Sequence, residues 1–185
     1  MSEPNRTLHS WSRTEYERMV DTGVFSAEAR LELVDGEIVE MSPQKSPHAT
    51  GTELVEEALR RCFGPGFHMR GQKPLAIDDR SEPEPDVAVV EGNIRDYSDH
   101  HPRTAVLLVE VADSTLAFDR MKKATVYARN GIPEYWILNL RDRTLEVHRS
   151  PADNSYTERS VLTAEQSLSP LAAPDARVEV SELLP

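Results

Sequence analysis

The sequence predicts a mixed α/β fold in which helices flank a central mixed β-sheet. Apolar, β-branched runs and amphipathic stretches follow one another in the order strand–helix–strand–strand–helix–strand. The 185 residues are 38% hydrophobic and 29% charged, which is typical of a globular protein with one sizeable core. We therefore expect a single domain over residues 1–185, with an N-terminal helix at 12–22 and a weakly ordered C-terminal tail at 150–185, in which weaker strands are expected near 156–162 and 177–180.

The N-terminal part of the chain predicts a capped helix and a hairpin. Ser12 is followed three residues later by Glu15, which is the spacing of a capping box at a helix start. Asp35-Gly36 stands between alternating apolar and polar residues, and this dipeptide favours a tight hairpin turn. We expect the paired strands at 30–34 and 37–41.

The middle of the chain predicts a helix and several strands. Apolar residues recur at helical spacing from His48 to about Cys62, and one or two strands follow within residues 67–77. Two short apolar runs, at 87–90 and 105–109, are joined by a polar loop and indicate neighbouring strands.

A second long helix and the clearest strand of the chain follow. The pattern predicts a continuous helix from about Leu116 to Asn130, which Gly131 and Pro133 would end. Its packing face is formed by small and apolar residues: Ala117, Met121, Ala124 and Ala128. The strand at 134–140 comes next.

Two acidic residues mark the ends of the two neighbouring apolar runs. Asp86 opens the first run and Glu110 closes the second, so antiparallel pairing would bring them together. Neighbouring strands lie about 5 Å apart, which lets two carboxylates share one divalent cation. The alternative is that Asp86 caps a turn and that Glu110 is a surface charge at a strand end.

A pair of lysines follows on the next predicted helix. Lys123 lies on one flank of the packing face, where it would orient or activate water and offset charge on a phosphate. The alternative is an i,i+4 ion pair between Lys123 and Asp119. Lys122 lies on the other flank, and the pattern separates the two lysines only weakly.

Other polar residues have weaker signals. Glu32 points away from the apolar side of its strand, as a solvated hairpin charge would, and His48 is typical of a polar helix start. The chain has no phosphate-binding glycine loop, nucleophile elbow or His-Glu-x-x-His motif. Its single cysteine, Cys62, excludes an internal disulfide and a cysteine-based zinc site.

Charge and hydropathy limit the functional classes. With 21 basic and 32 acidic residues the net charge is −11, which argues against a sequence-independent nucleic-acid binder but allows an enzyme with a local basic face. No apolar run approaches the roughly 20 residues of a membrane span, and the N-terminus lacks a signal-peptide pattern. We therefore expect a cytoplasmic protein.

Several stretches together resemble the Uma-type restriction endonuclease family, within the PD-(D/E)xK nuclease superfamily. They are Leu31–Ile38, Ser46–His48, Glu84–Val90, Leu108–Val111 and Lys123–Trp136. The resemblance covers about residues 10–150 and implies a restriction-endonuclease-like core with Mg²⁺- or Mn²⁺-dependent phosphodiester hydrolysis.

The resemblance also implies roles for individual residues. Asp86 and Glu110 would hold the metal, and Glu32 would supply an additional acid. His48 matches a recurrent family position. The superfamily's usual lysine, two residues after the second acid, is replaced here by Ala112, so Lys123 from the next helix would take its place.

These observations predict an endonuclease that hydrolyses DNA. One alternative is a catalytically inactive nuclease-fold module for interaction or DNA recognition, which would suit the net charge of −11. Another is a hydrolase of a different phosphoester. An apolar edge from Trp136 and the N-terminal helix would support a homodimer, an arrangement suited to cutting two strands.

Overall fold

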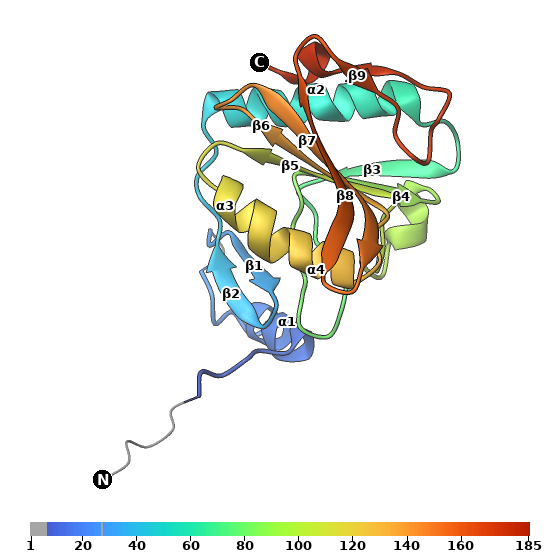
Figure 1. Cartoon of the computed structure of the whole chain (residues 1–185). Helices are drawn as coiled ribbons and strands as arrows, with labels where there is room; N and C mark the ends of the chain where they lie inside the picture. The colour runs from blue at the N-terminus through green and yellow to red at the C-terminus, as the bar shows by residue number, and fades with distance from the viewer. Residues whose placement is uncertain (1–6, 27) are drawn as a thin grey trace.

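A six-stranded mixed sheet forms the centre of the computed structural model, which describes residues 7–26 and 28–185 (Figure 1). The strand order is β3-β4-β5-β6-β7-β8, with β5 and β6 parallel and every other neighbouring pair antiparallel. The strands are β3 (Phe67–Gly71), β4 (Val87–Glu91), β5 (Leu107–Ala112), β6 (Glu134–Asn139), β7 (Thr144–Ala152) and β8 (Ser155–Thr163). The predicted mixed α/β fold is confirmed, although only the first part of 67–77 forms a strand.

Helices cover both faces of the sheet (Figure 1). Helix α2 (Ser46–Cys62) packs on one face, where its residues join a core with Val87 and Val109. On the other face, Ala88 and Leu108 pack with the helical segment after β5. Because successive residues of a strand point to opposite faces, the even-numbered residues of β4 and β5 face this second helical segment.

The second helical segment is not one regular helix. It consists of α3 (Leu116–Phe118), a π-helical turn (Asp119–Lys123) and α4 (Ala124–Arg129). The predicted packing face is therefore wrong in its first half, because Ala117 and Met121 are exposed, with Met121 at 68%. The π-helical turn contains one residue more than an α-helical turn. The residues before it and after it therefore do not lie on the same face of the helix.

A smaller unit packs on the same side of the sheet as α4 (Figure 1). It contains α1 (Arg13–Asp21), with the predicted capping box, and the hairpin β1 (Leu31–Val34) and β2 (Glu37–Glu40). The hairpin turn has positive φ at both central residues, 52° at Asp35 and 79° at Gly36, as a type I′ turn requires. A side chain at Gly36 would also collide with the Ser10 hydroxyl.

The C-terminal segment differs from the weakly ordered tail that the sequence suggested. Residues 150–163 complete β7 and form β8, and β9 (Ser167–Leu168) pairs with β10 (Val178–Glu179) before a 3₁₀ turn. Val180 and Leu183 are fully buried in the core on the α2 side. The few apolar residues of the C-terminal segment show no long periodic pattern, yet they complete the core on the α2 side of the sheet.

Trp136 does not form the exposed apolar edge that suggested a homodimer. Its side chain is fully buried in central strand β6, and its Nε1 donates a hydrogen bond to Glu134 Oε1 at 2.9 Å. Every residue of β6 is buried, so this strand offers no apolar side chain to a partner. No helix within 7–26 and 28–185 combines the length and the apolar character needed to cross a bilayer.

Candidate active site

The pairing of β4 with β5 brings Asp86 and Glu110 to the same end of the sheet. Val87 lies opposite Val109 and Ala88 opposite Leu108, so the next pair in this register is Asp86 with Glu110. The Asp86 backbone N–H donates to Glu110 Oε2 at 3.4 Å. Both acids lie on the face that carries α4, and their predicted proximity is confirmed.

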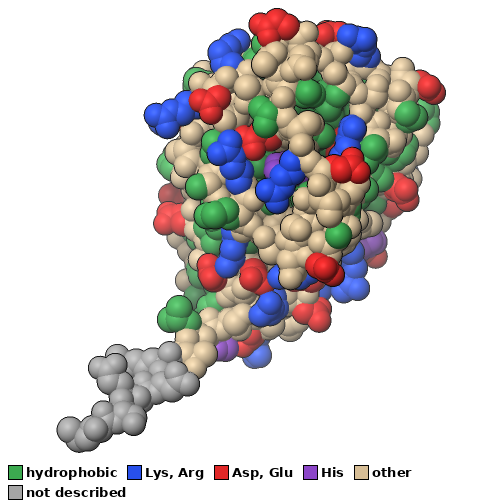
Figure 2. Space-filling model, in the orientation of Figure 1, with side chains coloured by type: hydrophobic (Ala, Val, Ile, Leu, Met, Phe, Trp, Pro, Cys, Tyr) green, Lys and Arg blue, Asp and Glu red, His purple; other side chains and the backbone are tan. Residues whose placement is uncertain are grey.

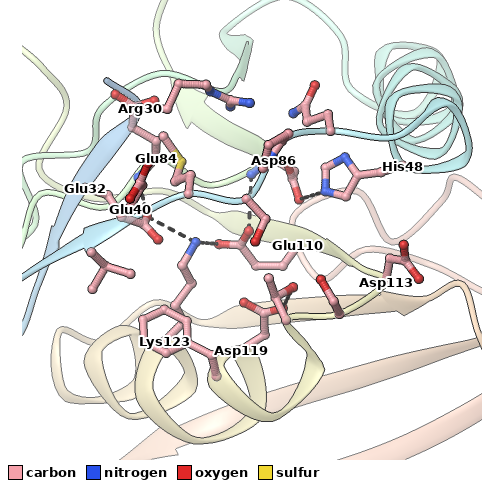
Figure 3. Close-up of a pocket in the computed structure, with 18 of the residues that line it drawn as sticks. Arg30, Glu32, Glu40, His48, Glu84, Asp86, Glu110, Asp113, Asp119 and Lys123 are labelled. Carbon is pink, nitrogen blue, oxygen red and sulfur yellow. Dashed lines mark hydrogen bonds and ion pairs between the residues drawn. The ribbon is translucent and has the colours of Figure 1, made fainter. Parts of the chain in front are cut away.

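Lys123 lies between two carboxylates at this end of the sheet (Figure 3). Its Nζ is 3.0 Å from Glu110 Oε1 and 3.1 Å from Glu32 Oε2. Among the described residues these are its ion-pair partners, so the alternative pair with Asp119 is wrong. Lys122 instead reaches Glu37 at 3.0 Å on the outer side of the helix, which separates the two lysines.

Glu32 is a buried residue, which overturns its interpretation as a solvated hairpin charge. Its side chain is only 4% exposed, and its Oε2 accepts a hydrogen bond from the Glu84 backbone N–H at 3.0 Å. The hairpin face that carries Glu32 is covered by the π-helical turn that supplies Lys123. Its strand is therefore buried on both faces.

Two side chains, His48 and Gln72, hold the Asp86 carboxylate, and Figure 3 shows His48 beside it. His48 Nε2 lies 3.2 Å from Oδ2, and Gln72 Nε2 donates to Oδ1 at 3.2 Å. Oδ2 also accepts from the Val111 backbone N–H at 2.8 Å. The hydrogen bond to Asp86 raises the pKa of His48 above its ordinary value. His48 thus contacts a site acid and is more than a polar helix start.

Three residues of the site had no functional signal in the sequence. Gln72 follows β3 with a positive φ of 48°. Tyr127 donates from its hydroxyl to Glu110 Oε1 at 2.8 Å. Asp119 is buried in the π-helical turn and accepts from the Thr115 hydroxyl at 2.7 Å. Each contact depends on long-range packing or on the irregular helix.

Carboxylates outnumber cations around Lys123. Burial raises the pKa of Glu110 well above its ordinary value, and burial raises the pKa of Asp119 to about 6. Burial alone would lower the pKa of Lys123, but Glu110, Glu32 and further carboxylates outweigh it and raise that pKa. The site therefore carries an excess of negative charge that a bound cation would relieve.

These residues line a pocket of about 460 Å³. The loop after β2, the start of α2 and the segment after β5 surround it (Figure 3). Its charged lining residues are Arg30, Glu32, Glu40, Lys45, Glu84, Asp86, Glu110, Asp113, Asp119 and Lys123. A pocket of this size admits a small ligand or part of a larger one.

A family model described as "Uma2: Putative restriction endonuclease" matches residues 13–181, a range that includes the whole site. The chain belongs to the Uma2 family. This confirms the family resemblance drawn from the sequence.

A solved structure supports the fold of this Uma2 family member. The chain resembles the crystal structure of a putative nuclease belonging to DUF820 from Anabaena variabilis ATCC 29413, with a TM-score of 0.67. The identity is 13%, over 94% of this chain and 97% of that one, so the likeness shows a shared fold. No curated protein matches the chain.

The donor set suits some metals better than others. In the part of the chain that the structure describes, no three His, Cys, Asp or Glu side chains are grouped so as to hold a metal ion. Zinc sites ordinarily need three or four protein ligands, whereas Mg²⁺ binds through one or two carboxylates and completes its shell with water and phosphate. The pair of Asp86 and Glu110, in a site with excess negative charge, fits the second kind of ion.

Proposed function

We propose that this protein is a metal-dependent endonuclease that hydrolyses phosphodiester bonds in DNA, with Asp86 and Glu110 holding Mg²⁺ or Mn²⁺. The observation that carries the proposal is the meeting of these two acids with the buried Lys123 in the lining of one pocket. The chemistry that such a cation supplies when bound is activation of a phosphate and of a water. Membership of the Uma2 family supports the same reaction class.

Lys123 is suited to stabilising charge. Its pKa is raised by the surrounding carboxylates, so its ammonium group stays protonated at neutral pH. A permanently charged ammonium cannot accept a proton from water, but it can offset the negative charge that develops on phosphate oxygens. Of the two roles predicted for Lys123, this favours charge compensation over water activation.

The surrounding residues keep the charged groups in place. Glu32 holds the ammonium of Lys123 from the side opposite Glu110, and Tyr127 fixes Glu110 through its hydroxyl. His48 and Gln72 restrain the two oxygens of Asp86. Such preorganisation reduces the reorganisation needed when substrate enters.

Calorimetry and a nuclease assay test the proposal together. We expect Mg²⁺ or Mn²⁺ to bind the wild-type protein, and we expect DNA cleavage that chelation stops. Asp86→Asn should abolish metal binding and lower the cleavage rate by at least about 100-fold, because metal activation contributes several kcal/mol to the transition state. Asp113→Asn is the matched control, since Asp113 lines the same pocket but is exposed and pairs with Lys45 at 3.6 Å.

A catalytically inactive nuclease-fold module is the second candidate. It is favoured by the net charge of −11 and by the acidic lining of the pocket, which repel a polyanion in the absence of a cation. Metal titration separates the two candidates. An inactive module would show no binding heat that depends on Asp86.

His48 provides a narrower prediction. We expect His48→Ala to weaken metal affinity by about 10–100-fold, because partners that orient a ligand commonly have effects of this size. The control is His68→Ala, since His68 lies in β3 outside this pocket. Equal metal affinities for wild type and His48→Ala, measured by calorimetry, would contradict a role for His48 in orienting Asp86.

A further inference from the structure

The reactive groups of the candidate site lie below the molecular surface. Asp86, Glu110 and Lys123 are 9%, 3% and 5% exposed, and all three line the pocket. A phosphate must therefore enter the pocket to reach them. The phosphates of an intact double helix are held on a stiff cylinder, and enzymes that must draw part of a nucleotide into a pocket, such as those that act on bases, use single strands or extrude the nucleotide from the duplex.

Apolar side chains also line the pocket. They are those of Val39, Met41, Pro43 and Phe118. Its volume of about 460 Å³ lies in the range of small-molecule sites, about 300–1,000 Å³, which suits one nucleotide. Phe118 is partly buried against the core on the α4 side, so its ring is anchored while it lines the pocket. Such a ring is a platform for an unpaired base.

The charges around the pocket do not suit a duplex. Its lining contains seven acidic and three basic residues, and one of these basic residues is the buried Lys123. The other two basic lining residues, Arg30 and Lys45, lie at the rim of the pocket. Lys45 also forms an ion pair with Asp113 at 3.6 Å. On the face that Figure 2 shows, basic and acidic side chains mingle and form no broad basic stripe. Affinity for duplex DNA depends on many phosphate contacts from Lys and Arg.

We propose that the substrate is an unpaired stretch of a polynucleotide, either a single strand or a locally melted duplex. This inference rests on the proposed nuclease function. One nucleotide enters the pocket with its base against Phe118, and the adjoining phosphate faces Asp86 and Glu110. Affinity then comes from stacking and apolar contact more than from charge.

Binding measured without cleavage tests the inference. The full-length Asp86→Asn protein is titrated into fluorescent DNA of one sequence as a single strand, a blunt duplex, or a duplex with an unpaired bubble, with the RNA single strand as a further arm. We expect the single strand and the bubble to bind at least about 10-fold more tightly than the blunt duplex. The magnitude of the salt slope of log K should stay below about 1.5, since two rim cations contribute about 0.7 each on a single strand.

Variants of Phe118 test the stacking platform. Phe118→Ala should weaken single-strand binding by about 10-fold, and Phe118→Leu, which keeps an apolar side chain, should weaken it similarly. Tyr97→Ala is the control, because Tyr97 is an aromatic residue that lines a different pocket. Full affinity in the folded Phe118→Leu protein would overturn the role of Phe118 as a base platform.

The outcomes separate this inference from the proposed function. Equal or tighter binding of the blunt duplex, or a steep salt slope, overturns the inference. Metal-dependent cleavage of the blunt duplex at the rate of the single strand also overturns it, while the proposed function stands. Preferential binding of the unpaired strand without any cleavage by wild type with Mn²⁺ supports recognition of unpaired strands by the pocket and overturns the proposed nuclease function.

Discussion

Replacing Lys123 with methionine is expected to lower the free energy of unfolding by about 3–5 kcal/mol, because removing one partner of a buried ion pair leaves unpaired charge. Lys123 is 5% exposed and contacts both Glu110 and Glu32. Methionine keeps an unbranched side chain of similar length, so the change removes mainly the charge. Urea unfolding followed by circular dichroism measures the loss.

The adjacent lysine is the control for this effect. Lys122 is 28% exposed at its side chain and pairs with Glu37, so Lys122→Met should change stability by less than about 1 kcal/mol. Adding Glu110→Gln to Lys123→Met should recover part of the loss, because it removes one of the unpaired carboxylates. Equal effects of the two single lysine substitutions would contradict the assigned geometry.

The meeting of Asp86 and Glu110 was predictable because it depends on local chain geometry. Two short apolar runs joined by one loop form an antiparallel pair, and the register then sets the acids side by side. The choice of Lys123 over Lys122 was not predictable. It depends on the π-helical turn Asp119–Lys123, which the helical repeat of 3.6 residues does not anticipate.

Residues fixed by long-range packing had no reliable sequence signal. The alternating pattern of β1 identifies its apolar side. It does not indicate that the π-helical turn with Lys123, far later in the sequence, covers the side that carries Glu32. Tyr127 has the apolar spacing of a core residue, and only the folded chain gives its hydroxyl a partner in Glu110. Leu183 in the C-terminal segment is likewise buried in the core, although no periodic apolar pattern surrounds it.

His148 should make the fold less stable in mild acid. It is 3% exposed, and among the described residues neither ring nitrogen has a hydrogen-bond partner. Burial lowers its pKa from 6.5 to about 4, and Arg159 adds to this effect. Below the unfolded pKa of 6.5 the unfolded chain binds a proton that the folded protein does not, so stability falls as the pH falls. The loss should reach about 3 kcal/mol near pH 4.

His148→Phe isolates this contribution. The ring of His148 lies 5.5 Å from that of Tyr135 and 5.8 Å from that of Tyr156, so a phenyl ring suits its surroundings without titrating. Glu110 and Asp119 also titrate with shifted pKa values, but they are present in both proteins and their effects cancel in the difference. The stability of wild type minus that of His148→Phe, from urea unfolding across the pH range, should be constant above about pH 7 and fall below it. A constant difference at every pH would mean that His148 is protonated as readily in the folded protein as in the unfolded chain.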